Sequence, residues 1–151
     1  MNKIKKIILV VIAVFVIIQF IRIDKSNPQT NPTSDIINIT NPPSEVKSIL
    51  KNACYDCHSY ETKYPWYAEI APVSWLLKNH INDGRRHINF STWGEVSNNE
   101  KKLHRLDECV EVVKEREMPM KPYVLMHKEA ELTEEQVNLL ANWFSAQKDS
   151  L

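Results

Sequence analysis

Two cysteines and a histidine stand together in the pentapeptide Cys54-Tyr55-Asp56-Cys57-His58. The Cys-x-x-Cys-His pattern is typical of a covalent attachment site for c-type haem. Each cysteine sulfur can form a thioether with one haem vinyl group, and the next residue can offer its imidazole to the iron. The motif therefore predicts covalently bound haem c, with Cys54 and Cys57 as attachment points and His58 as the proximal iron ligand.

The same spacing occurs in other kinds of site, and we favour haem over three of them. A thioredoxin-like redox pair would need a surrounding βαβ pattern, which the sequence lacks. A structural disulfide between Cys54 and Cys57 would close a very small, strained loop. A zinc site would need two further ligands, usually a second close Cys/His pair. No such pair is formed by the remaining candidates, which are Cys109, His80, His87, His104 and His127.

The iron in a haem electron carrier usually has a second axial ligand, and methionine opposite histidine raises the reduction potential. Met118 and Met120 lie in the loop Met118-Pro119-Met120-Lys121-Pro122-Tyr123, between two amphipathic segments, and Met126 follows. We prefer Met118 as the distal ligand, with Met120 as the alternative. Two other arrangements stay open. One is a five-coordinate iron, and the other is a second histidine ligand from among His80, His87, His104 and His127.

Two further side chains could belong to the site. Arg85 follows Asp83-Gly84, and its forked donors suit a carboxylate such as a haem propionate, although a solvated basic turn is an equally good interpretation. Cys109 lies beside the apolar stripe of a predicted helix, where a lone cysteine is best interpreted as a small buried side chain.

Helical patterns dominate the elements that must position these residues. The sequence holds 2 glycines and shows no regular strand alternation. The predicted helices cover residues 44–53, 73–81, 99–117 and 133 onwards. The first runs directly into Cys54, the second turns Trp75-Leu76-Leu77 inward and stops at Asp83-Gly84, and the last begins with the capping box Thr133-Glu134-Glu135-Gln136. We expect an all-α fold, a small cytochrome c-like helical domain around one covalent haem.

The N-terminal segment is apolar enough to predict a single membrane-spanning helix. The stretch from Ile4 to Ile23 has the length of about 20 residues that a bilayer requires, and three lysines precede or open it. By the positive-inside rule these lysines stay in the cytoplasm. A cleaved signal peptide is the alternative, but no small-residue cleavage site follows. We expect an anchor over 1–23, a Pro- and Asn-rich linker over 24–43 and the haem domain over 44–151.

Charge is divided unevenly along the chain. Of 19 basic and 19 acidic residues, the first 25 positions hold five basic residues and one acidic residue. The remainder is mildly acidic, which argues against a nucleic-acid partner. The predicted topology puts the domain after Ile23 outside the cytoplasm, and c-type haem is attached on that same face of the bacterial inner membrane, so we expect the haem domain on the periplasmic side.

With these motifs in hand, the domain resembles the bacterial haem-binding domain family of small c-type cytochromes. The resemblance covers residues 44–146 and rests on the following segments: Cys54–Ser59, Tyr64–Tyr67, Ile70–Val73, Trp75, His80–Arg85, Ile88–Ser91, Trp93, Met118-Pro119, Tyr123 and Trp143. It implies covalent haem, His58 as proximal ligand and a membrane-linked or periplasmic place. This chain has Met118-Pro119-Met120 where a Met-Pro-Pro run is common in such cytochromes.

The function expected from these features is that of a membrane-anchored monohaem c-type cytochrome. It would pass single electrons between a redox partner protein at the membrane and an acceptor outside the cytoplasm. No constellation of acid, base and nucleophile stands out, so we expect an electron carrier rather than an enzyme. The alternatives are a haem-based sensor or gas-binding module and a peroxidase-like haem protein.

Overall fold

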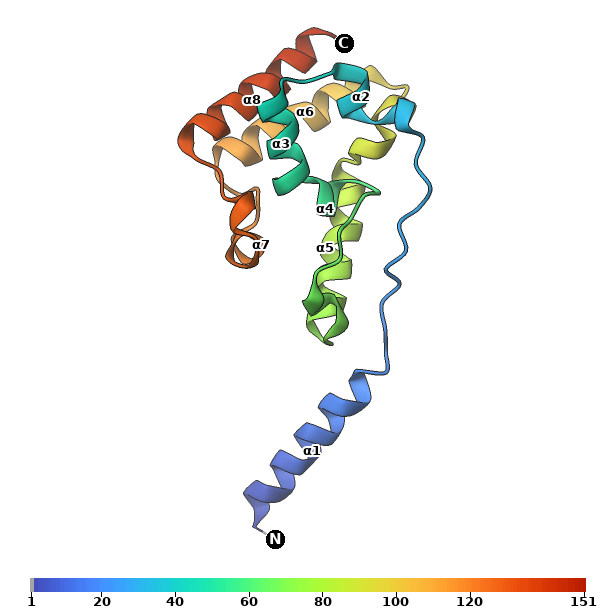
Figure 1. Cartoon of the computed structure of the whole chain (residues 1–151), viewed down its shortest axis with the longest axis vertical. Coiled ribbons are helices and arrows are strands. Elements are labelled where there is room, and N and C mark those ends of the chain that lie inside the picture. The colour runs from blue at the N-terminus through green and yellow to red at the C-terminus, as the bar shows by residue number, and fades with distance from the viewer. Residues whose placement is uncertain (1) are drawn as a thin grey trace.

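Residues 2–151 are described by the computed structural model, and their regular secondary structure is entirely helical (Figure 1). The α-helices of this part of the chain are α1 (Lys3–Ile18), α2 (Ile36–Thr40), α3 (Ser44–Ala53), α4 (Tyr55–His58), α5 (Val73–His87), α6 (Asn99–Lys114), α7 (Lys121–Met126) and α8 (Glu134–Asp149). The 3-10 helices are η1 (Pro32–Ser34), η2 (Trp66–Glu69), η3 (Phe90–Glu95) and η4 (Lys128–Ala130). The prediction of an all-α domain is therefore confirmed.

The core is built on α6 and α8, which pack along each other (Figure 1). Their buried faces consist of Leu106, Cys109 and Val113 from α6 and Val137, Leu140, Ala141, Trp143 and Phe144 from α8. The predicted capping box is confirmed, because Gln136 N donates to Thr133 Oγ1 at 3.2 Å and Thr133 N donates to Gln136 Oε1 at 3.1 Å. These two bonds satisfy amides that the first turn of α8 would otherwise leave without partners.

The helices α3 and α4 bring the Cys-x-x-Cys-His motif against this core. The start of α3 at Ser44 agrees with the prediction, and its apolar face is buried through Val46, Ile49 and Leu50. Cys54 stands between the two helices, and its carbonyl accepts hydrogen bonds from the amides of both Cys57 (3.2 Å) and His58 (2.9 Å). The motif is thereby wound into a single helical turn next to the core.

The segment predicted as a linker over 24–43 is folded in its second half, which corrects the expected domain boundary. Ile36 and Ile37 of α2 are buried in the main core cluster. Asp35 caps the start of α2, because its Oδ1 atom accepts a hydrogen bond from the amide of Ile37 at 2.9 Å. The same Oδ1 atom accepts a hydrogen bond from the Tyr55 hydroxyl at 2.8 Å. Two buried isoleucines and a buried polar anchor tie this segment to α4, so the domain begins near residue 32.

The predicted helix over 73–81 is longer in the structure, and Asp83-Gly84 does not end it. The helix α5 continues to His87 because Gly84 serves close packing rather than a turn. A Cβ atom at this position would lie 2.9 Å from the carbonyl oxygen of Cys57, which is closer than atoms of this kind approach each other. Leu76, expected to face inward, is 56% exposed.

The N-terminal helix α1 has 16 residues, compared with the stretch of 20 predicted from Ile4 to Ile23, and none of its residues is buried. It ends where the Gln19 side chain pairs with the backbone of Ala71, donating to its oxygen and accepting from its nitrogen, each at 3.0 Å. Within residues 2–151, no helix is both long and apolar enough to cross a membrane.

Candidate haem site

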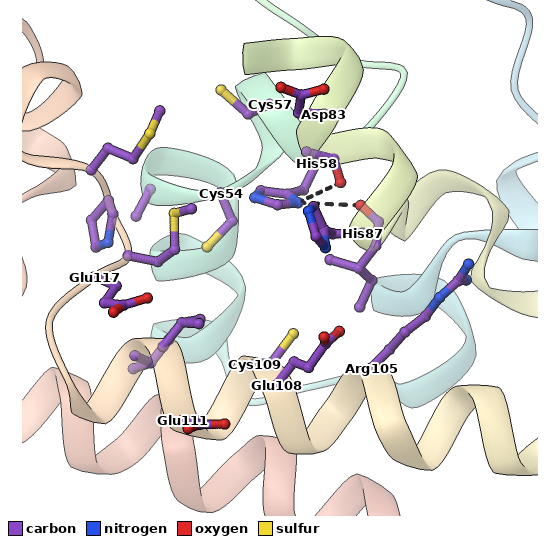
Figure 2. A pocket seen from close by; sticks show the side chains of 18 of the residues that line it. Cys54, Cys57, His58, Asp83, His87, Arg105, Glu108, Cys109, Glu111 and Glu117 are labelled. Atoms are coloured by element: carbon purple, nitrogen blue, oxygen red, sulfur yellow. Dashed lines mark hydrogen bonds between the residues drawn. The ribbon is translucent and has the colours of Figure 1, made fainter. Parts of the chain in front are cut away.

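A cavity of about 590 Å³ opens beside the Cys-x-x-Cys-His motif, a volume within the range of about 300–1,000 Å³ that cofactor pockets occupy. Its walls come from α3, α4, α5, α6 and the loop that joins α6 to α7 (Figure 2). Besides the methionines of the loop, its apolar lining includes Ala53, Ile88, Phe90, Val112, Val113, Pro119 and Phe144. Cys54, Cys57 and His58 all line this cavity, so the structure brings the three predicted haem-binding residues together at one wall.

The His58 ring is oriented by two backbone carbonyls near the end of α5. Its Nδ1 atom lies 3.0 Å from the oxygen of Gly84 and 3.2 Å from the oxygen of Ile88. A carbonyl oxygen can only accept a hydrogen bond, so Nδ1 carries the proton and Nε2 keeps its lone pair. Figure 2 shows the second nitrogen of the ring turned away from α5. This is the tautomer that a metal-binding imidazole requires.

The two carbonyls orient the His58 ring, and burial keeps it neutral. The ring lies among apolar neighbours, and burial lowers the pKa of His58 below its usual value, because a charged imidazolium is poorly solvated there. The two carbonyls oppose this effect and draw the pKa upward. Since the net shift is downward, the lone pair on Nε2 is available at neutral pH.

The two motif cysteines are free thiols in the structure, rather than a disulfide. Burial raises the pKa of Cys54 to about 12 and that of Cys57 to about 11, since a thiolate would be poorly solvated beside the apolar wall. Both thiols are therefore protonated at neutral pH. In Figure 2 they flank His58, and the Cys54 sulfur is directed into the cavity. Two S–H groups beside an open imidazole nitrogen form the donor set that covalent haem attachment needs.

Asp56, between the two cysteines, ties the motif to the far side of the cavity. Its Oδ2 atom accepts the hydroxyl of Tyr123 at 2.8 Å, and its Oδ1 atom accepts the amide of Lys63 at 2.9 Å. Tyr123 lies on α7, which follows the methionine loop. No local sequence signal marks Asp56 as part of the site, because its partner Tyr123 is 67 residues away.

The methionine loop also faces the cavity. Met118 and Met120 both line it, whereas Met126 does not and is 50% exposed. The loop leaves α6 at Arg116, which adopts the left-handed conformation (φ 61°) that commonly ends helices. The amides of residues 117 and 118 then bond to the carbonyl of Val112 at 2.9 and 3.0 Å. In Figure 2, Glu117 of this loop and His87 of α5 lie at opposite sides of the cavity, so the loop approaches from the side opposite α5.

Comparison with known proteins agrees with this geometry. The chain matches the family model described as the haem-binding domain over residues 13–146. The chain belongs to the haem-binding domain family. The match extends beyond the resemblance over 44–146 and includes η1 and α2, which the core also incorporates. No curated protein and no solved structure matched the chain.

The remaining histidines of this haem-binding domain divide into two pairs. His80 and His87 line the cavity and both come from α5, the helix that holds Nδ1 of His58. His104 is exposed and lies 3.5 Å from the Glu108 carboxylate. His127 bonds to the Tyr67 hydroxyl at 2.8 Å, outside the cavity. Of the histidines considered as a second iron ligand, only the α5 pair therefore borders the site.

Arg85, considered in the sequence analysis as a propionate contact, does not line the cavity. Its Nε atom donates to the Ser59 oxygen at 2.8 Å, and its Nη2 atom donates to the Thr62 hydroxyl at 3.0 Å. The structure therefore places this guanidinium on the loop after the motif. Arg105 of α6 lines the cavity instead, and within residues 2–151 it forms no side-chain hydrogen bond or ion pair. The sequence offered no signal for Arg105, because it stands among the other charged residues of α6.

The donor set fits haem better than the alternatives. In residues 2–151, no group of three or more His, Cys, Asp and Glu side chains is arranged to hold a metal ion, so the zinc alternative gains no support. Cys109 is buried, as predicted, and also borders the cavity, where burial raises its pKa to about 12. A flat apolar macrocycle with one open iron position suits a cavity that offers apolar walls, two thiols and one neutral imidazole.

Proposed function

We propose that this protein is a monohaem c-type cytochrome that carries single electrons. The observation that supports this most strongly is the His58 tautomer, with Nδ1–H committed to Gly84 and Ile88 and Nε2 left open beside two free thiols. Cys54 and Cys57 would hold the haem through thioether bonds, and His58 would be the proximal ligand. When bound, the haem supplies one-electron chemistry at its iron.

The chain's own residues would set the properties of that iron. The two carbonyls on Nδ1–H increase the electron donation of the imidazole. The apolar walls restrict water at the site, and a low dielectric disfavours the more highly charged ferric form. Met118 would supply a soft distal ligand that favours ferrous iron, with Met120 as the alternative. The apolar walls and the methionine would favour the reduced state, whereas the stronger donation from His58 would favour ferric iron, so the balance among these residues would set the reduction potential.

Covalent attachment is tested by expressing the full chain in a bacterial host with c-type haem attachment machinery. The expected result is a haem-stained band that survives denaturing electrophoresis, and the mass of one haem added to the intact protein. Replacement of both cysteines by serine should remove the covalent haem and leave the His58 environment in place. A wild-type protein that folds fully and remains colourless would contradict the proposal.

The distal ligand is tested with three methionine variants of the haem-loaded protein. Met118→Ala should abolish the methionine–iron charge-transfer band and lower the reduction potential. Met126→Ala is the matched control, since Met126 lies outside the cavity, and it should change neither. If only Met120→Ala removes the band, Met120 is the ligand. Rapid carbon monoxide binding to the reduced protein, with no band to displace, would favour a gas-binding module over an electron carrier.

We also propose that α1 and the apolar residues that follow it anchor the protein in the bacterial inner membrane, with the haem domain in the periplasm. The proposal rests on a helix whose apolar side chains are exposed on every side and on the lysines at its start. The redox partner would then be a protein at that membrane. Membrane fractions washed with alkaline carbonate should retain the full chain, and protease added outside spheroplasts should digest the haem domain. Release by the wash would contradict the anchor.

A further inference from the structure

The chain that follows α1 is attached to one end of the haem domain by a series of hydrogen bonds. The Trp75 indole nitrogen donates to the oxygen of Ile21 at 3.0 Å, and the Lys78 ammonium donates to the oxygen of Asp24 at 2.6 Å. These bonds add to the paired contacts between Gln19 and Ala71. Residues 19–24 are therefore in contact with the start of α5, and the end of α1 is positioned relative to the domain.

Ion pairs strengthen the same attachment. Glu69, at the end of η2, accepts from Arg22 at 2.8 Å and also contacts the Lys25 ammonium. The two cations lower the pKa of the Glu69 carboxyl, so this residue is charged at neutral pH. Glu69 is two residues before Ala71, which Gln19 contacts, so the hydrogen bonds and the ion pairs hold the same segment. The junction between anchor and domain is thus a defined contact rather than a free tether.

Several large apolar side chains are exposed on the elements that meet at this junction. They are Trp66 of η2 (68% exposed), Ile70 (36%), Val73 (46%) and Leu76 (56%), and Phe20 (82%) of the preceding chain. We call these five residues the apolar tip. Single exposed apolar residues are ordinary on soluble proteins, but a group of them marks a contact surface. The apolar tip is continuous with α1, whose apolar side chains are exposed as well.

We propose that the apolar tip is a membrane-contact surface that rests in the interfacial layer of the same bilayer that holds α1. Two observations favour lipid as the occupant. The tip adjoins a helix that is apolar on all sides, and it presents a tryptophan, which is typical of the membrane interface.

This contact would set the position of the haem site above the membrane. The tip lies at the start of α5. One of the two carbonyls that orient His58 belongs to Gly84, towards the other end of the same helix. At about 1.5 Å per residue, the helix carries the chain roughly 16 Å from Val73 to Gly84. A tip resting on lipid would hold the haem site at a fixed distance and tilt, within reach of a membrane-bound redox partner. The inference rests on the proposed membrane anchor.

The test uses the full haem-loaded chain in vesicles of phosphatidylcholine and phosphatidylglycerol. A photoreactive benzophenone side chain is placed at position 76 in the tip, and in a second protein at position 103. Leu103 of α6 is the matched control because it is also an exposed leucine (36%), and α6 lies at the end of the domain opposite α1 (Figure 1). After irradiation, the position-76 protein should form lipid adducts at least about fivefold more often than the control.

The outcomes separate this inference from the anchor on which it rests. If the chain floats with the vesicles but position 76 labels no more lipid than position 103, the tip inference fails and the anchor stands. If position 76 labels a second copy of the chain, the surface is a self-association site and the inference is overturned. If the chain does not float, the anchor fails and the tip inference fails with it. Both labelled positions are exposed, so neither change should prevent folding.

Discussion

Replacement of Gly84 by alanine would test the close contact between α4 and α5 on which the site depends. The added Cβ would lie 2.9 Å from the carbonyl oxygen of Cys57 and 3.2 Å from its carbonyl carbon. Both neighbours are backbone atoms of the haem motif, so no flexible side chain can move aside. The two helices would have to separate, and the hydrogen bond from His58 to the Gly84 oxygen would lengthen with them.

Two opposing effects set the expected size of the change. Forcing an extra carbon into a packed contact costs about 1–3 kcal/mol. Alanine in place of glycine inside a helix contributes about 1 kcal/mol of stabilisation. Because the obstacle is backbone, we expect the steric cost to exceed the helical gain, with a net loss of about 1 kcal/mol in the free energy of unfolding.

Urea unfolding of the purified protein, followed by circular dichroism, measures this loss. For a slope of about 1–3 kcal/mol per molar urea, the midpoint for Gly84→Ala should fall by roughly 0.3–1 M. Asn82→Ala is the matched control, because Asn82 is an exposed residue of the same helix. It gains helix propensity without a contact and should raise the midpoint slightly. A Gly84→Ala protein stabilised as much as the control would refute the steric argument.

Three further changes probe other contacts. Tyr55→Phe removes the buried hydroxyl that Asp35 accepts at 2.8 Å, and should lower the free energy of unfolding by about 2–3 kcal/mol in urea titrations; a loss below 0.5 kcal/mol would contradict it. Tyr123→Phe removes the partly exposed bond to Asp56 and should cost about 1 kcal/mol in the same assay, whereas an unchanged midpoint would show that α7 is held by packing. Glu69→Gln breaks the exposed ion pairs with Arg22 and Lys25. Trypsin should then cut after the two cations up to about fivefold faster, with the urea midpoint unchanged; equal cleavage rates would refute the attachment.

Local patterns in the chain were sufficient to predict much of the fold. The helix that begins at Ser44 follows from apolar spacing, and the helix after Thr133 follows from apolar spacing and a capping box, and both signals act within a few positions along the chain. The haem motif itself is contained in five consecutive residues. Family membership follows from short motifs of the same kind, and the match over 13–146 confirms it.

Elements that depend on distant contacts were predicted less well. Asp83-Gly84 resembles a helix stop, yet α5 continues through it because Gly84 meets Cys57 of α4. The Pro- and Asn-rich segment before α3 resembles a linker, yet Ile36 and Ile37 are buried against the core. In both places the local propensity is weak, and burial against another part of the chain is the stronger contribution.

The sequence by itself determined that this chain belongs to the haem-binding domain family and which residues, Cys54, Cys57 and His58, form its Cys-x-x-Cys-His motif, because the motif lies within five consecutive positions. Only the tertiary structure decided the tautomer and the orientation of the His58 imidazole. The proton on Nδ1 of His58 is directed by carbonyls that lie 26 and 30 residues further along the chain. It also decided that Arg105, rather than Arg85, borders the cavity. A side chain's type is written in the sequence, but its tautomer and direction depend on neighbours that only folding brings within a few ångströms.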